Sequence, residues 1–173
     1  MDGLLNINKP PGLTSFGVVR RVRKVSGERR VGHTGTLDPS AQGVLVLCLG
    51  KATKVSAYLF EKDKEYRATI KLGESTDTDD ATGRVLFRAP VPPLGSEETE
   101  RTLSEFLGAI EQVPPLFSAV KVKGERLYRM ARRGGSAKPK ARRVQVREIE
   151  LLRFESPLLE IRVVCSKGTY VRS

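Results

Sequence analysis

Strand-like segments outnumber helical ones in this chain, and no regular series of helices separates them. A doubly wound parallel sheet needs a crossover connection, usually a helix, between successive strands. The order of elements therefore excludes that architecture and predicts an α+β fold. Apolar alternation or continuous apolar runs predict strands at 44–49, 66–72, 84–88, 144–154 and 158–164, the last two as a pair.

Two segments have the apolar spacing of helices. Thr14 or Ser15 can cap the first, which carries apolar residues on one face and basic residues on the others. The second follows Ser96, and its early acidic residues suit the positive end of a helix. The apolar residues that define the second helix are Leu103, Phe106, Leu107 and Ile110.

The glycine-rich segment 32–45 carries a single carboxylate, Asp38, just before an apolar run. Because Pro39 disfavours helical geometry in the residue before it, Asp38 is expected on a loop. A rigid loop at the edge of a sheet is a suitable mount for a nucleophile or base. From the residues alone, that function and a simple turn leading into a strand both stay open.

The positive charge of the chain is concentrated in one segment. The formal net charge is +11 and the pI is about 10.0, which points to a polyanion, nucleic acid or a membrane surface as partner. Residues 121–147 hold eleven Lys or Arg against one acid, Glu125, and so carry nearly the whole excess. A solvated surface is the alternative, but a binding face is favoured because the rest of the chain is almost balanced.

No targeting, membrane or cofactor signature is evident. The chain lacks a signal-peptide pattern and any apolar run of membrane-spanning length. Its two cysteines, Cys48 and Cys165, have no metal spacing, so buried thiols in a reduced cytoplasmic setting are expected. Neither a dinucleotide-binding glycine pattern nor a phosphate-binding loop is present, and we expect no cofactor and no metal.

Several motifs resemble, in the same order, those of the TruB family of tRNA pseudouridine synthases. They run from the first ten residues to the last, beginning with the pattern Gly-His-Thr-Gly-Thr-Leu-Asp-Pro-Ser-Ala-Gln-Gly around Asp38. The others are Asn8-Lys9-Pro10-Pro11-Gly12-Leu13-Thr14-Ser15, Lys64-Glu65-Tyr66-Arg67-Ala68, residues 76–83, Pro114-Pro115-Leu116-Phe117-Ser118-Ala119, Arg126-Leu127-Tyr128 and residues 165–172.

The resemblance implies the pseudouridine synthase fold, a mixed and mainly antiparallel central sheet flanked by helices. Residues 1–173 would form the N-terminal portion of one catalytic domain. The basic segment 121–143 would be an inserted thumb, an arm that closes on RNA. The implied partner is the T-arm of tRNA, with no membrane and no metal, and the protein is expected to be a cytoplasmic monomer.

The same resemblance implies isomerisation of uridine 55 in the tRNA T-loop to pseudouridine after base flipping. Asp38 would be the catalytic residue, and attack on the sugar, attack on the base and assisted loss of the base all stay open. Tyr66 would be the active-site aromatic, either stacking on the flipped base or removing a proton. Arg172 would pair with Asp38 and keep it ionised.

A further set of residues is expected to contact RNA or to support the site. His33, the single histidine, matches the family residue that enters the T-loop. Lys9 is expected chiefly to brace the site, and for Thr78 and Asp80 a structural role and a binding role stay open. The remaining candidates are Tyr170, which lines the pocket, and the arm residues Arg132, Arg133, Arg142 and Arg143.

Two alternatives to this function are a tRNA-folding module without turnover and a guide-RNA-dependent synthase of box H/ACA particles. The second lacks an inserted thumb, so residues 121–143 weigh against it. Family members continue beyond the point that corresponds to Ser173. From this we expect a poorly anchored Arg172, weak catalysis by residues 1–173, and an exposed apolar edge at strand 158–164.

Overall fold

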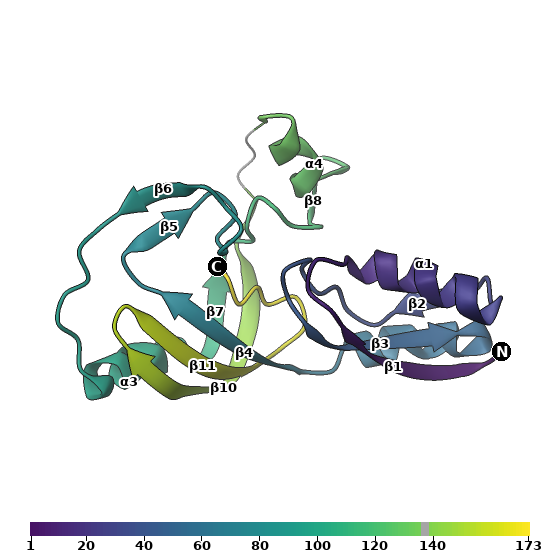
Figure 1. Cartoon of the computed structure of the whole chain (residues 1–173), viewed down its shortest axis with the longest axis horizontal. Coiled ribbons are helices and arrows are strands. Elements are labelled where there is room, and N and C mark those ends of the chain that lie inside the picture. The colour runs from purple at the N-terminus through teal and green to yellow at the C-terminus, as the bar shows by residue number, and fades with distance from the viewer. Residues whose placement is uncertain (136–138) are drawn as a thin grey trace. The chain divides into compact units, whose positions relative to one another are not determined.

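The computed structural model describes residues 1–135 and 139–173 (Figure 1). The chain forms two compact units, residues 1–62 and 63–173. All strand pairs among the described residues are antiparallel, and helices accompany the sheets. The α+β class predicted from the order of elements is confirmed.

The first unit is a three-stranded sheet with a helix along one face (Figure 1). Its strand order is β1-β3-β2, and the continuous apolar run of β3 places that strand in the middle. Val18 and Val19 of the helix pack on Leu45, Leu47 and Leu49 of the sheet. The elements are β1 (Gly3–Lys9), α1 (Ser15–Ser26), β2 (Val31–His33), β3 (Gly43–Leu49), η1 (Gly50–Val55) and α2 (Ser56–Phe60).

The helix expected after Thr14 is confirmed as α1, and Thr14 is its N-cap. The Thr14 hydroxyl accepts a hydrogen bond of 2.9 Å from the backbone N–H of Gly17. The helix ends at Ser26, and its C-cap Gly27 has a φ of 69°, the left-handed conformation that glycine adopts without strain. Both cysteines of the chain, Cys48 and Cys165, are free and fully buried.

The second unit is built on a four-stranded sheet of order β4-β11-β10-β7, with two small two-stranded ladders, β5–β6 and β8–β9. Helix α3 packs against β10. The elements are β4 (Lys64–Lys71), β5 (Glu74–Thr76), β6 (Val85–Arg88), α3 (Ser96–Ser104), β7 (Gly108–Gln112), β8 (Lys121–Val122), β9 (Glu125–Arg126), α4 (Leu127–Arg132), β10 (Arg142–Glu155) and β11 (Leu158–Cys165).

Strand β11 lies inside this sheet, which corrects the expectation of an exposed edge at 158–164. It pairs with β10 on one side, as the sequence predicted, and with β4 on the other. Leu159, Ile161 and Val163 are consequently buried. The prediction failed because strand order within a sheet is set by long-range pairing, which position along the chain does not reveal.

Helix α3 is shorter than predicted. It ends at Ser104, so the apolar spacing of Phe106, Leu107 and Ile110 is not helical. Gly108 has a φ of 90° and turns the chain into β7, where Ile110 pairs with Val144 of β10. Partial burial of Ile110 against the core of the four-stranded sheet explains its apolar character.

The basic segment 121–143 contains the β8–β9 ladder and α4, while Arg142 and Arg143 already belong to β10. Residues 136–138 of this predicted arm lie outside the described residues. Among the helices of the described part, none is long and apolar enough to cross a membrane.

Candidate functional site

Asp38 lies on the loop that connects β2 to β3, as its sequence context predicted. Its backbone carbonyl accepts a hydrogen bond of 3.1 Å from the N–H of Ala41, which closes a four-residue turn. Proline suits the second position of such a turn because its φ is fixed. The Asp38 residue is half-buried.

Both neighbours of Asp38 are anchored by hydrogen bonds to residues 12–15. The Leu37 backbone N–H donates to the Ser15 hydroxyl at 2.9 Å, and that hydroxyl donates to the Leu37 carbonyl at 3.2 Å. The Pro39 carbonyl accepts from the N–H of Gly12 at 2.7 Å. The sequence predicts for Ser15 only the role of a helix cap, because it does not show that residues 12–15 and 37–39 meet.

Lys9 is fully buried, and its ammonium group lies among backbone carbonyls. It donates to the carbonyls of Leu13 at 2.7 Å, Pro10 at 3.0 Å and Pro39 at 3.3 Å. Burial lowers the pKa of Lys9, and the nearby Asp38 carboxylate partly offsets this effect. The geometry fits the bracing role, since a fully buried ammonium presents no surface to RNA.

His33 ends β2 and is half-buried at the start of the same loop. Burial lowers its pKa, and a backbone hydrogen bond with Gly35 offsets part of this effect. The imidazole is therefore neutral at pH 7 and suited to stacking or to neutral hydrogen bonds. Among the described residues, no cluster of His, Cys, Asp and Glu could hold a metal ion.

Tyr66 is in the second unit, on β4. Its partly buried ring packs against Val146, Val163 and Cys165, and its Cα is opposite that of Val163 in β11. One side of the ring thus belongs to the core of the unit. Such partial burial is compatible with a core aromatic and with a residue that lines a pocket.

The loop 76–83 is organised around Asp80. Its carboxylate accepts hydrogen bonds from the hydroxyls of Thr78 and Thr82, at 2.7 and 2.6 Å, and from the Thr82 N–H at 2.9 Å. Burial raises the pKa of Asp80, but these hydrogen bonds and the charge of Arg172 outweigh burial, so the pKa lies below its usual value. Asp80 is therefore an anion at neutral pH and ties the loop together.

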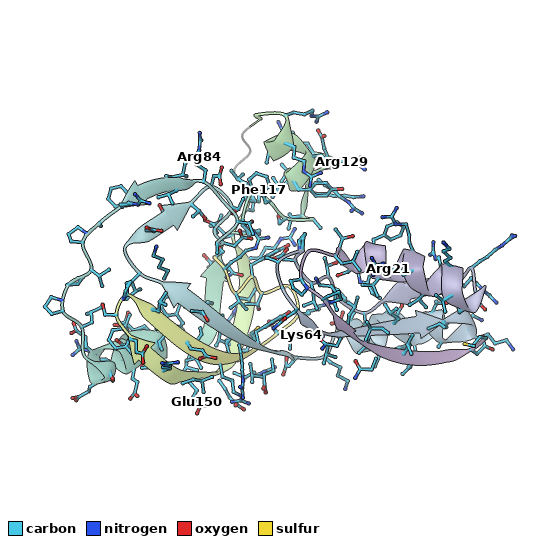
Figure 2. The ribbon with its side chains drawn as sticks, viewed as in Figure 1. Arg21, Lys64, Arg84, Phe117, Arg129 and Glu150 are labelled. Atoms are coloured by element: carbon cyan, nitrogen blue, oxygen red, sulfur yellow. The ribbon has the colours of Figure 1, made fainter. Side chains whose placement is uncertain are left out.

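Arg172 extends from the segment after β11 toward this loop. Its guanidinium donates to the carbonyls of Thr78 and Phe117, each at 2.8 Å, and lies 5.8 Å from the ring centre of Tyr170. Figure 2 shows Phe117 in the loop that precedes β8. These contacts correct the expectation of a poorly anchored Arg172.

The backbone on either side of Arg172 is fixed by Gln112, the last residue of β7. Its side-chain amide bonds the backbone of Tyr170 and Ser173. Sequence reasoning missed this residue. Its place just before the Pro114–Pro115 motif was the one signal available, and that position alone does not indicate a partner.

Among the described residues, the basic side chains of the predicted arm are exposed, and several of them have partners within it. Arg132 stacks 5.7 Å from the ring centre of Tyr128, and Arg133 forms an ion pair with Glu125. Helix α4, which also carries Arg129 (Figure 2), is anchored where the Leu127 N–H donates to the Val120 carbonyl at 2.8 Å. Arg142 and Arg143 are exposed at the start of β10.

Seven of the predicted site residues thus form two groups. Lys9, His33 and Asp38 lie on or under one loop of the first unit. Thr78, Asp80, Tyr170 and Arg172 lie together in the second unit. Because Asp38 and Arg172 belong to different units, their expected pairing stays a prediction.

Comparison with known proteins gives a family match over most of the chain. Residues 23–171 match the family described as "TruB family pseudouridylate synthase (N terminal domain)". The tRNA pseudouridine synthase B of Caldanaerobacter subterraneus subsp. tengcongensis is 49% identical over the whole chain and 61% of its own length. That of Clostridium acetobutylicum is 50% identical over the whole chain and 60% of its own length.

Solved structures match the fold as well. A Cbf5-Nop10-Gar1 complex contains a chain with a TM-score of 0.71 and 34% identity, covering 99% of this chain and 41% of the other. An H/ACA RNP bound to a substrate RNA containing 2′-deoxyuridine matches with a TM-score of 0.69 and 30% identity, covering 99% and 40%. The chain spans about three fifths of the length of the curated relatives it matches.

Proposed function

The chain belongs to the TruB family of pseudouridylate synthases, and from that premise we propose that the complete protein isomerises uridine 55 in the T-loop of tRNA. The observation that carries the proposal is the anchored loop of Asp38. Leu37 and Pro39 are held by backbone and side-chain hydrogen bonds, and a buried cation, Lys9, lies close by. A carboxylate held in this way is suited to act on a substrate.

The reaction breaks the N1–C1′ bond of uridine, turns the base and forms a C5–C1′ bond. C5 then loses its proton and N1 gains one, so no electrons are exchanged and no redox cofactor is needed. We assign to Asp38 the assistance of bond cleavage, whether by attack or by elimination. Tyr66 would face the base, and Arg172 would keep Asp38 ionised.

The target uridine lies within a folded RNA arm, so it must be flipped out before reaction. A neutral His33 at the edge of the Asp38 loop is suited to stack in the rearranged T-loop. The exposed arginines of the arm and of β10 would contact phosphates, which supply affinity without sequence preference. These assignments account for the uneven distribution of charge along the chain.

The solved neighbours suggest a second candidate, a guide-RNA-dependent synthase. Their titles describe assemblies with Nop10, Gar1 and H/ACA RNA, at 30–34% identity. The relatives called tRNA pseudouridine synthase B are 45–50% identical to the chain. The concentrated basic charge of residues 121–143 also supports direct recognition of RNA, so we keep the tRNA enzyme as the proposed function.

A single-turnover assay on a T-arm hairpin, in the complete protein, tests the proposal. We expect the parent to form pseudouridine without a guide RNA, and Asp38→Asn to form none while the Kd for the hairpin stays within about threefold. Turnover by Asp38→Asn near the parent rate would remove Asp38 from the chemistry. Binding of the hairpin without turnover by the parent would favour the tRNA-folding module.

A further inference from the structure

Gln112 makes hydrogen bonds with both ends of its side-chain amide. Its Oε1 accepts from the Tyr170 N–H at 2.9 Å, and its Nε2 donates to the carbonyls of Tyr170 at 2.8 Å and Ser173 at 2.9 Å. The opposite orientation of the amide would place NH₂ against N–H and oxygen against two carbonyls. The partners therefore determine the orientation.

The backbone of Gln112 is itself held in the sheet. The residue ends β7, where its Cα is opposite that of Arg142 in β10. The next residue, Val113, accepts a hydrogen bond of 3.0 Å at its carbonyl from the Ser173 hydroxyl. Strand β7 thus provides a rigid base from which one side chain reaches the segment 170–173.

The hydrogen bonds from Gln112 to Tyr170 and Ser173 hold the backbone on both sides of Arg172. Residues 170 and 173, on either side of Val171 and Arg172, are the two that Gln112 bonds. With this backbone fixed, the Arg172 guanidinium reaches the carbonyls of Thr78 and Phe117. These two residues lie on separate loops, 94 and 55 residues away from Arg172 in the sequence. These carbonyl partners are dipoles and not anions, so they orient the guanidinium without neutralising it, and the Asp80 carboxylate, whose pKa Arg172 lowers, is a charged group nearby.

We propose that Gln112 is a positioning residue, which holds the 170–173 backbone so that the Arg172 guanidinium keeps a fixed direction during the reaction. The inference rests on the proposed function, since it assigns Arg172 to the support of an ionised Asp38. Gln112 itself touches no reacting atom. If the guanidinium points in one direction throughout, it stabilises the ionised Asp38 carboxylate equally in every turnover.

The test compares Gln112→Met with Ala109→Met in the complete protein. Ala109→Met places the same side chain at an exposed position of the same strand. Single-turnover rates on a T-arm hairpin are measured from about pH 5 to 8 together with the Kd for the hairpin and the melting temperature. The parent and Asp38→Asn are measured first, because an inactive parent would overturn the proposed function and not the role of Gln112.

For Gln112→Met we expect a rate at least about tenfold lower, with the Kd within about twofold of the parent. The acid limb of the pH–rate profile should move to higher pH, because a misdirected cation stabilises the ionised carboxylate less. Gln112→Asn keeps a neutral amide on a side chain one methylene shorter, so its rate should be intermediate.

Two results would overturn this role. One is a loss of rate that is equal at every pH, which a general loosening of the fold would produce. The other is a change confined to the Kd. If Gln112→Met does not fold, Gln112→Asn decides between positioning and a purely structural role by the same shift of the acid limb.

Discussion

The Thr78 hydroxyl donates a hydrogen bond of 2.7 Å to the Asp80 carboxylate, and Gly83 lies directly against the same hydroxyl. A Cβ added at Gly83 would overlap with the Thr78 Oγ1 and come within 2.7 Å of the Asp77 Oδ1 and 2.9 Å of the Thr76 Cβ. Glycine at this position is therefore required by the close approach of the loop to itself. The loop also supplies the Thr78 carbonyl to Arg172.

We predict that Gly83→Ala destabilises the second unit by about 1–3 kcal/mol, the usual cost of forcing an extra methyl group into a packed site. Urea unfolding followed by tyrosine fluorescence would measure it. Gly32→Ala is the matched control, because a Cβ there meets no atom within 4 Å. Equal stabilities of the two variants would mean that the loop shifts freely to accept the methyl group.

Lys9→Met should lower the free energy of unfolding of the first unit by about 1–3 kcal/mol, because three carbonyls lose their donor in a buried site. Chemical denaturation with far-UV circular dichroism is the measurement. Lys54→Met, at an exposed lysine of the same unit, should stay within about 0.5 kcal/mol of the parent. A Lys9→Met protein as stable as the parent would argue against the bracing role.

The pKa of His33 should lie below its ordinary value of 6.5, because burial disfavours the charged imidazole. The chain has one histidine, so a single imidazole signal in a proton NMR titration reports it. Since the folded-state pKa is the lower one, stability should fall as pH drops below 6.5 and continue to fall until the folded-state pKa is passed.

The control for this titration is His33→Gln, whose stability should depend less on pH in that window. Carboxylates also titrate at low pH, so the difference between the two proteins is the relevant quantity. A midpoint at or above 6.5 in the folded protein would contradict the assigned neutral state of His33.

Neutralising Arg132, Arg133, Arg142 and Arg143 together should reduce the salt dependence of tRNA affinity. Each lost phosphate contact removes about 0.7–0.9 from the slope of log K against log salt, so a change of about two or more is expected. Filter binding or fluorescence anisotropy over a salt series measures the slope. An unchanged slope would mean that these four arginines are solvated and that RNA contacts another surface.

A matched control for this prediction removes the same number of charges elsewhere. Lys71, Arg88, Arg147 and Arg153 each form an ion pair with a neighbouring carboxylate. Their joint neutralisation changes the net charge equally. If both quadruple variants flatten the slope alike, then the effect reports overall charge and not a binding surface.

Sequence patterns missed β1, β2, β5 and β7–β9 but predicted β3, β4, β6, β10, β11 and the Asp38 loop, because apolar alternation and proline geometry act over a few residues. Helix α1 and its Thr14 cap were predicted for the same reason. The end of α3 was not predicted correctly. Ile110 has the spacing of a helical residue, but it is buried because β7 pairs with β10. An apolar residue can be buried either by strand pairing with a distant segment or on the apolar face of a helix. The spacing of apolar residues alone does not distinguish these two environments.

The site shows the same division between local and long-range information. Asp38 and the Thr78–Asp80 loop could be found from residue types at fixed spacing. Ser15 and Gln112 could not, because their partners are 22 and 58 residues away or more. A serine before a helix and a glutamine at a strand end have many possible roles, and the long-range contact selects one.

The position of β11 gives the last prediction. Because β11 is paired on both sides, its backbone amides should exchange slowly with deuterium in native conditions, as expected for the interior of a sheet. Strand β7, paired with β10 alone within this sheet, should exchange faster. Peptide-resolved exchange followed by mass spectrometry would compare residues 158–165 with 108–112, and faster exchange in the former would mean that this end of the chain is an exposed edge after all.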